Sequence, residues 1–434
     1  MKKIFAMTMI VGGLAAGLPA FPQESRTYTI DECVAEAVRN NLSLRNAGNE
    51  IAMAGEQRRE AFTKYFPTVS AMGGGFIANK GMLEMDLGGM TMSLAKDGLV
   101  AGVTAMQPVF AGGQIVNGNR LAKVGEEAAR LQCGLSENEV RLNTEKYYWQ
   151  LVQLKENLRT LDLLGRQLER AHQDARNAVD AGVRNRNDLL QVQLRQNEVK
   201  ASVIKVENAA ATVRDLLAQV MGRAGESVEV DNPLAADGNA ASYPMPESPQ
   251  RLYQPEQSSL QQTCEYRLLE KQVEADRLQY KLAVGKNLPT VAVGGGYLYN
   301  NVMDKSQNRL VGMFSVSVPI SGWWGGSHDM KRRKLQVENA ENEKRDKGEL
   351  LVVRMRKAWN DLSDAYRQVE IARESIAQSE ENLRLNTDYY QTGTATMSDL
   401  LDAQSLYQQS RDKYVQSFTD YEVKKREYLQ ATGR

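Results

Sequence analysis

The sequence predicts a mainly α-helical protein with a β-barrel part, built from a duplicated unit of long coiled-coil helices and one β-hairpin. Three observations predict this class. The chain repeats its own landmarks, its 11 prolines leave a long uninterrupted stretch in each copy, and the short segments beside four of those prolines alternate polar and apolar side chains. The long stretches are therefore predicted to be helices, and the short alternating segments strands.

The duplication covers most of the chain. Pro67-Thr68-Val69 returns as Pro289-Thr290-Val291, 222 positions later. Later landmarks are 211 positions apart: Pro108 pairs with Pro319, Gly182 with Gly393, Asp188 with Asp399, and Gly222 with Gly433. Because neither shift is a multiple of seven, coiled-coil periodicity does not account for the match. The first copy therefore carries 11 extra residues, between Gly75 and Pro108.

Targeting and composition suggest an exported protein. Residues 1–20 have the pattern of a cleaved secretory signal, with Lys2 and Lys3 ahead of an apolar run that ends near Ala20. This run is shorter than the ~20 residues of a membrane-spanning helix. The three cysteines are odd in number and not duplicated, so no disulfide framework is expected. Acidic and basic residues number 54 each, which gives no reason to expect nucleic-acid binding.

The landmarks also set the expected domain boundaries. After the signal segment we expect a first repeat at 21–230, a Pro-rich linker at 231–256 and a second repeat at 257–434. Each repeat should hold a helix, a β-hairpin and a helical hairpin; the β-hairpins are expected at about 67–108 and 289–320, and the helical hairpins at about 115–221 and 329–431.

Heptad spacing of apolar residues predicts the helical hairpins. In the first copy, Leu151, Leu154, Leu158 and Leu161 follow one another at alternating steps of three and four. At 1.5 Å per residue this arm is about 100 Å long, far longer than the ~30 Å of bilayer hydrocarbon, so its polar faces must stand in water. In the second copy, tyrosines recur every seven residues at positions 407, 414, 421 and 428. We expect these rings to pack in the seam with their hydroxyls at its edge.

The short segments have the period-two pattern of strands. Val291, Val293, Tyr297 and Tyr299 share one parity. Each segment is about ten residues long, the length of a membrane-spanning barrel strand, although a water-soluble hairpin is the alternative. Export, the duplication of the hairpin and Trp323-Trp324, where an interfacial aromatic would sit, favour an outer-membrane barrel. Since the smallest such barrels need eight strands, several chains must pool theirs.

Two further segments carry expectations. The extra residues fall in the first hairpin loop, Asn79 to Gly98, which should face outside the cell; four methionines lie there, Met82, Met85, Met90 and Met92. Thioethers are soft enough to hold copper(I), but a flexible loop composition accounts for these residues, and we expect no metal site. The linker from Asp231 to Glu256 should pack as a belt outside the helical barrel, together with the chain ends.

Several short motifs resemble those of the TolC-like outer-membrane efflux proteins, and the resemblance extends over practically the whole mature chain. The segment from Gln107 to Gly113 resembles the family's Gln-Pro-Leu-Phe-Asp-Gly-Gly exit from strand to helix, without the aspartate, and Val318-Pro319-Ile320 opens its degenerate twin. The turns at Gly182 and Gly393 are similar to the family's Val-Gly-Thr-type turns, and Asp399-Leu400-Leu401-Asp402 to its Asp-Val-Leu-Asp helix start.

This resemblance implies a homotrimer. Twelve strands would form one barrel in contact with outer-membrane lipid, six helical hairpins would form a tunnel through the periplasm, and the hairpin tips would form a closable aperture. The implied function is the exit duct of a tripartite efflux or secretion system, with a periplasmic adaptor and an inner-membrane pump as partners.

The resemblance also implies roles for the tip residues. The acidic lining of the family's aperture maps to Asp399 and Asp402, and Asp188 is the corresponding residue of the first tip. A ring of carboxylates would attract cations and oppose closure. Helix capping is the alternative, and for Asp188 the favoured one.

The adaptor contact maps to Gly182 and Gly393, with Val183 and Thr394 beside them. Each glycine also supplies the positive φ of a tight helix turn. The family's locking arginine after the second tip glycine is absent, since Thr394 and Ala395 stand there. A candidate lock uses Arg184 or Arg186 of the first tip.

Other functions are less compatible with the sequence. An enzyme is not expected, because the two histidines, His172 and His328, lie far apart and no nucleophile elbow, phosphate loop or metal-spaced cluster is present. No cofactor is expected either. The alternatives kept open are an exported coiled-coil scaffold and, within the same fold, a type I duct that exports whole polypeptides.

Overall fold

The computed structural model describes residues 27–79, 83–86, 91–94, 97–234, 243–302, 306–320 and 322–434. The expected signal segment, residues 1–20, and Met82 and Met90 of the first hairpin loop lie outside the described residues. Among the residues described, no helix combines the length and the apolar content needed to cross a membrane.

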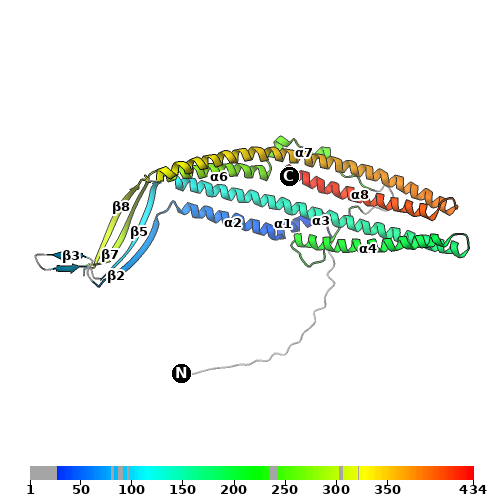
Figure 1. Cartoon of the computed structure of the whole chain (residues 1–434), viewed down its shortest axis with the longest axis horizontal. Helices are drawn as coiled ribbons and strands as arrows, with labels where there is room; N and C mark the ends of the chain where they lie inside the picture. The colour runs from blue at the N-terminus through cyan, green and yellow to red at the C-terminus, as the bar shows by residue number, and fades with distance from the viewer. Residues whose placement is uncertain are drawn as a thin grey trace, which may run out of the picture.

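The molecule is a long rod with a β-sheet at one end and two helical hairpins that run away from it (Figure 1). The first repeat contains α1 (Ile30–Asn40), α2 (Leu42–Thr63), β2 (Thr68–Ile77), β5 (Asp97–Ala111), α3 (Gln114–Asp180) and α4 (Arg186–Val220). The second contains α5 (Glu256–Leu260), α6 (Cys264–Lys286), β7 (Thr290–Asn301), β8 (Gln307–Ser317), α7 (Gly322–Gln391) and α8 (Met397–Ala431). The predicted duplicated unit of long helices and one β-hairpin is confirmed.

Four antiparallel strands form the main sheet, in the order β2-β5-β7-β8. The two hairpins have equivalent registers: Thr68 faces Met106 in the first copy, and the residues 222 and 211 positions later, Thr290 and Ser317, face each other in the second. Within the described residues, β2 and β8 are edge strands. A separate small ladder of β3 (Leu83–Asp86) and β4 (Thr91–Leu94) occupies the longer first loop.

The helical hairpins turn through the same glycine motif. Gly182 and Gly393 have φ of 73° and 81°. After Gly182, the Val183 N–H donates to the Ala178 carbonyl five residues back; after Gly393, the Thr394 N–H donates to the corresponding carbonyl of Tyr389. This is the Schellman arrangement, in which glycine adopts the left-handed conformation without the steric cost of a side chain. Gly222 and Gly433 end the return helices in the same way.

The start of α7 corrects one expectation. The helix was expected from about residue 329, but it begins at Gly322, so Trp323 lies in its first turn. The Trp323 indole donates to the Asn287 carbonyl, 2.9 Å away. A Cβ on Gly326 would lie 1.8 Å from the Asn287 side-chain oxygen. Glycine-rich sequence disfavours helix locally, but here the absence of side chains lets the helix pack directly on the end of α6.

The second-copy tyrosines pack as predicted, and their hydroxyls contact the linker. Tyr414, Tyr421 and Tyr428 are fully buried in the main core, which α3, α4, α7, α8 and linker residues share. Tyr414 donates to the carbonyl of Pro244, and Tyr421 to that of Glu247. The Tyr428 hydroxyl accepts from the N–H of Gln254 at 2.9 Å. Burial raises the pKa of Tyr421, so its hydroxyl remains a donor at neutral pH.

The other end of the linker binds the first repeat. Tyr148 of α3 donates to Asp231, and the Asn232 amide donates to the buried Glu156. The parallel pair of β1 (Thr27–Tyr28) and β6 (Glu229–Val230) brings the start of the described chain to the same place. The described linker residues therefore hold the two repeats together at mid-length.

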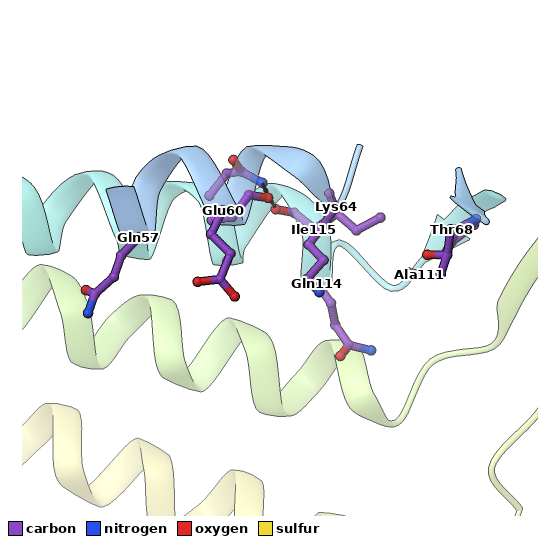
Figure 2. A pocket seen from close by; sticks show the side chains of 11 residues that line it. Gln57, Glu60, Lys64, Thr68, Ala111, Gln114 and Ile115 are labelled. Atoms are coloured by element: carbon purple, nitrogen blue, oxygen red, sulfur yellow. Dashed lines mark hydrogen bonds between the residues drawn. The ribbon is translucent and has the colours of Figure 1, made fainter. Parts of the chain in front are cut away.

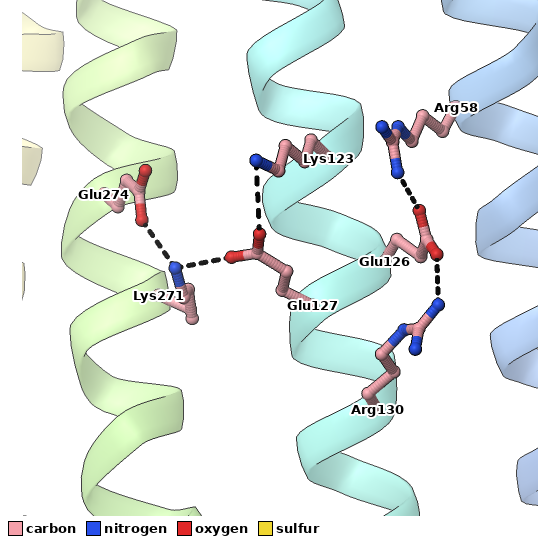
Figure 3. A network of polar contacts seen from close by, with 7 residues as sticks. All are labelled: Arg58, Lys123, Glu126, Glu127, Arg130, Lys271 and Glu274. Atoms are coloured by element: carbon pink, nitrogen blue, oxygen red, sulfur yellow. Dashed lines mark hydrogen bonds and ion pairs between the residues drawn. The ribbon is translucent and has the colours of Figure 1, made fainter.

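Charged side chains add a second tie between the repeats, closer to the sheet. Glu127 of α3 accepts from Lys271 of α6 at 2.6 Å, while its neighbour Glu126 accepts from Arg58 of α2 at 3.0 Å (Figure 3). The Lys271 ammonium lowers the pKa of Glu127. Because solvent screens these partly exposed groups, each pair contributes little stability on its own. Together they hold α2, α3 and α6 side by side.

We predict that Tyr421→Phe destabilises the protein by about 0.5–1.5 kcal/mol, because it removes the hydrogen bond from the buried tyrosine to the Glu247 carbonyl while retaining the ring. The measurement is the shift of the thermal unfolding transition. Tyr389→Phe is the matched control, since this ring is half exposed at the hairpin tip. Equal stability of the two variants would show that the linker is not held by this bond.

Candidate functional site

The two faces of the main sheet differ in polarity. Pairing places large apolar side chains on one surface, called here the apolar face: Val69, Leu99, Val103, Val293, Tyr297, Leu310, Phe314 and Val316, all of them exposed. The opposite surface, the polar face, carries Ser70, Thr104, Asn300, Arg309 and Ser315. Phe314 is 80% exposed within the chain. An apolar band opposite a polar one is the pattern of a barrel strand between lipid and a water-filled lumen.

Exposed aromatic side chains gather where the sheet meets the helices. Phe62, at the end of α2, contacts Tyr65 and Phe66 with ring centroids 5.5 and 5.7 Å apart. Trp323 and Trp324 open α7 at the same end of the sheet and are 47% and 77% exposed. Large amphipathic rings at this level are typical of a membrane–water interface.

The strand-to-helix exit of the first copy depends on a contact between two glycines. Gly112 has a φ of 58°, and a Cβ there would lie 2.3 Å from the carbonyl oxygen of Gly285 in α6. A Cβ on Gly285 would meet the Gly112 carbonyl oxygen at 2.5 Å. The family-like segment from Gln107 to Gly113 thus needs glycine where α6 of the second repeat touches the turn.

A cavity of about 510 Å³ lies beside this exit, between α2, β2 and the start of α3 (Figure 2). Its polar side chains include Glu60, Lys64 and Gln114, and none of the residues singled out from the sequence as tip sites line it. Nowhere in the described part of the chain do three His, Cys, Asp or Glu side chains gather as a metal cluster. The cavity belongs to the junction that aligns the helices with the sheet.

The four expected adaptor-contact residues lie at the hairpin tips, at the end of the rod opposite the sheet (Figure 1). Val183 is 76% exposed. The Thr394 hydroxyl donates to the Tyr389 carbonyl at 3.0 Å and so belongs to its own turn. A Cβ on Gly182 or Gly393 would meet no atom within 4 Å, so only their positive φ restricts these positions.

Arg184 connects the two tips within one chain, whereas Arg186 does not. The Arg184 guanidinium donates to the Tyr390 carbonyl at 3.1 Å and lies 4.7 Å from the centre of the Tyr390 ring. Arg186 is exposed in the first turn of α4 and has no polar partner among the described residues. No local sequence signal points to Tyr390 as the partner of Arg184, because the two residues are 206 positions apart.

Asp399 takes part in capping its helix, whereas Asp188 does not cap α4. The Thr396 hydroxyl and the Asp399 carboxylate form a capping box: Asp399 accepts from the Thr396 N–H at 2.8 Å, and Thr396 accepts from the Asp399 N–H at 3.2 Å. The hydrogen bond that the Thr396 hydroxyl donates to the Asp399 carboxylate at 2.6 Å, together with that from the Thr396 N–H, lowers the pKa of Asp399. The favoured capping role of Asp188 was wrong, since Asn185 caps α4 through the N–H of Asn187.

Asp402 differs from both. It lies one helical turn beyond Asp399 on the same exposed side of α8, and no hydrogen bond of its carboxylate is found within the described residues. Within the described residues, the Asp402 carboxylate is therefore not used in helix capping and is available to attract cations.

A groove of about 880 Å³ separates the two tips. Its lining includes Val183, Arg184, Tyr390, Gly393 and Leu400, so both turns contribute. The Arg184–Tyr390 contact lies in this groove, which places the candidate lock and the candidate docking residues at one site.

Comparison with known proteins agrees with this geometry. The family model of the outer membrane efflux proteins matches residues 33–223 and 257–434. No curated protein matches the chain. Among solved structures, VceC of Vibrio cholerae is similar with a TM-score of 0.79 at 13% identity, covering 93% of this chain and 96% of that one. CmeC of Campylobacter jejuni has a TM-score of 0.78 at 14% identity, covering 99% and 94%.

The open state of the Neisseria gonorrhoeae MtrE channel has a TM-score of 0.75 at 16% identity, covering 93% of this chain and 88% of that one. At such low identity, the structural matches speak for the fold. The family match includes both repeats and well over half of the chain, and the chain therefore belongs to the outer membrane efflux protein family, the outer-membrane exit ducts of tripartite efflux systems.

Proposed function

We propose that three copies of this chain assemble into one exit duct. Each copy would give four strands to a twelve-stranded barrel in the outer membrane and two helical hairpins to a tunnel through the periplasm. The observation that carries the proposal is the four-stranded sheet itself, which has two edge strands and an exposed apolar face. Four strands cannot close a barrel alone. A coiled-coil scaffold would have no use for such a sheet.

The tips would meet the periplasmic adaptor, which connects the duct to an inner-membrane pump. Gly182, Val183, Gly393 and Thr394 are the contact residues, supported by the exposure of Val183 and by the groove between the turns. Asp399 and Asp402 would line the aperture, with Asp188 in the other tip. Arg184 would hold the aperture closed by tying α7 to the first tip. The chain is a passive conduit in this account, with no catalytic step.

The duplication predicts the seam between copies. β5 of the first repeat pairs with β7 of the second, with Thr104 facing Gly296. The position equivalent to Thr104, 211 residues later, is Ser315 in β8. The position equivalent to Gly296, 222 residues earlier, is Gly74 in β2. We therefore expect Ser315 of one copy to face Gly74 of the neighbouring copy. Both lie on the polar face, and a Cβ on Gly74 would meet no atom within 4 Å.

We therefore expect Ser315→Cys, Gly74→Cys to form covalent dimers and trimers on oxidation, because facing residues in antiparallel strands have Cβ atoms about 5 Å apart. The measurement is a non-reducing denaturing gel. Ser315→Cys with Gly73→Cys is the control, since Gly73 points to the opposite face. Variants with only one of the introduced cysteines show how much cross-linking comes from the three natural cysteines. Cross-linking in the control but not in the test pair would contradict this register.

Arg184→Ala should raise the conductance of the closed channel. The change removes a hydrogen bond and a cation–π contact of about 1 kcal/mol each, and the sum of about 2 kcal/mol corresponds to a roughly thirtyfold larger open fraction. Single-channel recording in planar bilayers measures it. Arg186→Ala is the matched control and should leave conductance unchanged. The lock is refuted if the Arg184→Ala, Arg186→Ala double variant conducts like the parent.

Substitutions of Asp399 and Asp402 should have different effects, because only Asp399 caps a helix. Asp402→Asn is expected to lower cation selectivity, measured as the reversal potential in a salt gradient, without loosening the first turn of α8. Asp399→Asn should change selectivity and also increase hydrogen exchange there, because it weakens the capping box. Unchanged cation selectivity in both variants would show that these carboxylates do not line the conducting aperture.

The pH dependence of this cap follows from the lowered pKa of Asp399. The stabilisation is complete above the ordinary aspartate pKa and is lost as the pH falls through the lowered value. After correction for intrinsic exchange, the difference between the parent and Asp399→Asn should therefore vanish in acid and persist at pH 7.

A further inference from the structure

Methionines are concentrated in the barrel part of the chain. Of the 17 in the sequence, eight fall between residues 68 and 111 or between 290 and 317: Met72, Met82, Met85, Met90, Met92, Met106, Met303 and Met313. These two segments are a small part of the 434 residues. Three of the eight, Met72, Met106 and Met313, lie in strands of the main sheet.

Strand pairing brings two of them to one place on the polar face. Met106 of β5 faces Gly294 of β7, and Gly294 faces Met313 of β8. Met106 and Met313 thus flank a glycine, on the same face as Thr104 and Ser315. Both methionines are half-buried. Neither contributes to the apolar face.

The glycine allows the two thioethers to approach each other. The Met106 sulfur lies 2.2 Å from the point where a Cβ of Gly294 would be, so it occupies the space of the missing side chain. The Cβ of Met313 is about 5 Å from that point by ordinary cross-strand geometry. A methionine side chain is long and flexible enough to cover this distance by a change of rotamer. Both sulfurs can therefore contact one small ion.

We propose that Met106 and Met313 form a binding site for a soft monovalent metal cation, Cu(I) or Ag(I), on the inner wall of the barrel. Thioether sulfur selects soft ions over the hard cations that carboxylates and water bind. The site departs from the expectation that the chain binds no metal. It rests on the proposed function, since the polar face must line the duct. Three copies would place three such sites around the lumen.

The chain offers a matched control. Met72 lies on the same polar face, but its partner in β5 is Gly102, which in turn faces Leu298 of β7. It therefore has no second thioether beside it across these strands. Replacement of Met72, which is 59% exposed, by leucine changes the lumen surface without removing a pair.

The experiment measures block of the open channel by silver. The trimer carries Cys133→Ser and Cys264→Ser, because these two thiols are partly exposed, whereas Cys33 is buried. Planar-bilayer currents are recorded in sodium nitrate, free of chloride, with silver nitrate added on both sides. We expect silver to reduce the current in this parent and in Met72→Leu. In Met106→Leu, Met313→Leu the half-blocking concentration should rise about tenfold, with the sodium current unchanged.

Each result decides the proposal. An equal half-blocking concentration in the double variant, or no block of the parent, would mean that the methionines only fill space on the lumen wall. A sodium current that matches the parent shows that the double variant folds and assembles. Absence of any current from the parent, and also from the parent that carries Arg184→Ala, would overturn the proposed duct itself, and the metal site with it.

Discussion

Unpaired strand edges are the constraint on which the rest of this structure depends. In hydrocarbon, each backbone N–H or C=O without a partner costs several kcal/mol, so a sheet with β2 and β8 at its edges cannot stay open there. Pairing with neighbouring copies satisfies both edges at once. Since every strand continues into a helix through a short turn such as that at Gly112, closing the barrel also arranges the long helices in a ring. The periplasmic tunnel is thus a consequence of the sheet.

The helices are held unevenly along their length. At mid-length the linker joins both repeats through buried tyrosine hydroxyls and through Tyr148 and Glu156 of α3. Toward the sheet, the glycine contact between Gly112 and Gly285 fixes the junction. Toward the tips, the repeats are joined by the hydrogen bonds of Arg184 with Tyr390 and of Arg195 with Ser405, and by a smaller buried cluster that includes Leu168, Val192, Met397 and Leu400. The larger buried cluster lies at mid-length and a groove separates the two turns, so the tips are the part of the rod best suited to change the width of an opening.

Much of this fold could be predicted because the chain is duplicated and its periods are strong. The shifts of 222 and 211 predict that Thr290 and Ser317 pair as Thr68 and Met106 do, and the heptads place Leu151 and Leu161 in the buried seam. The start of α7 was missed because glycines at 322, 325 and 326 disfavour helix in isolation, whereas the close contact of Gly326 with Asn287 leaves no room for a side chain at that position. Tyr390 as partner of Arg184 has no local signal. The Thr396-x-x-Asp399 box was readable, since that spacing is the signature of a capped helix start.

The mass of the detergent-solubilised mature chain, determined on the same sample that is recorded in planar bilayers, decides whether several chains form one barrel. The account predicts a trimer that inserts and conducts, because only pooled strands close the barrel. A stable monomer or dimer in water, without conductance, would contradict it, since the edge strands and the apolar face would then have no function in this protein.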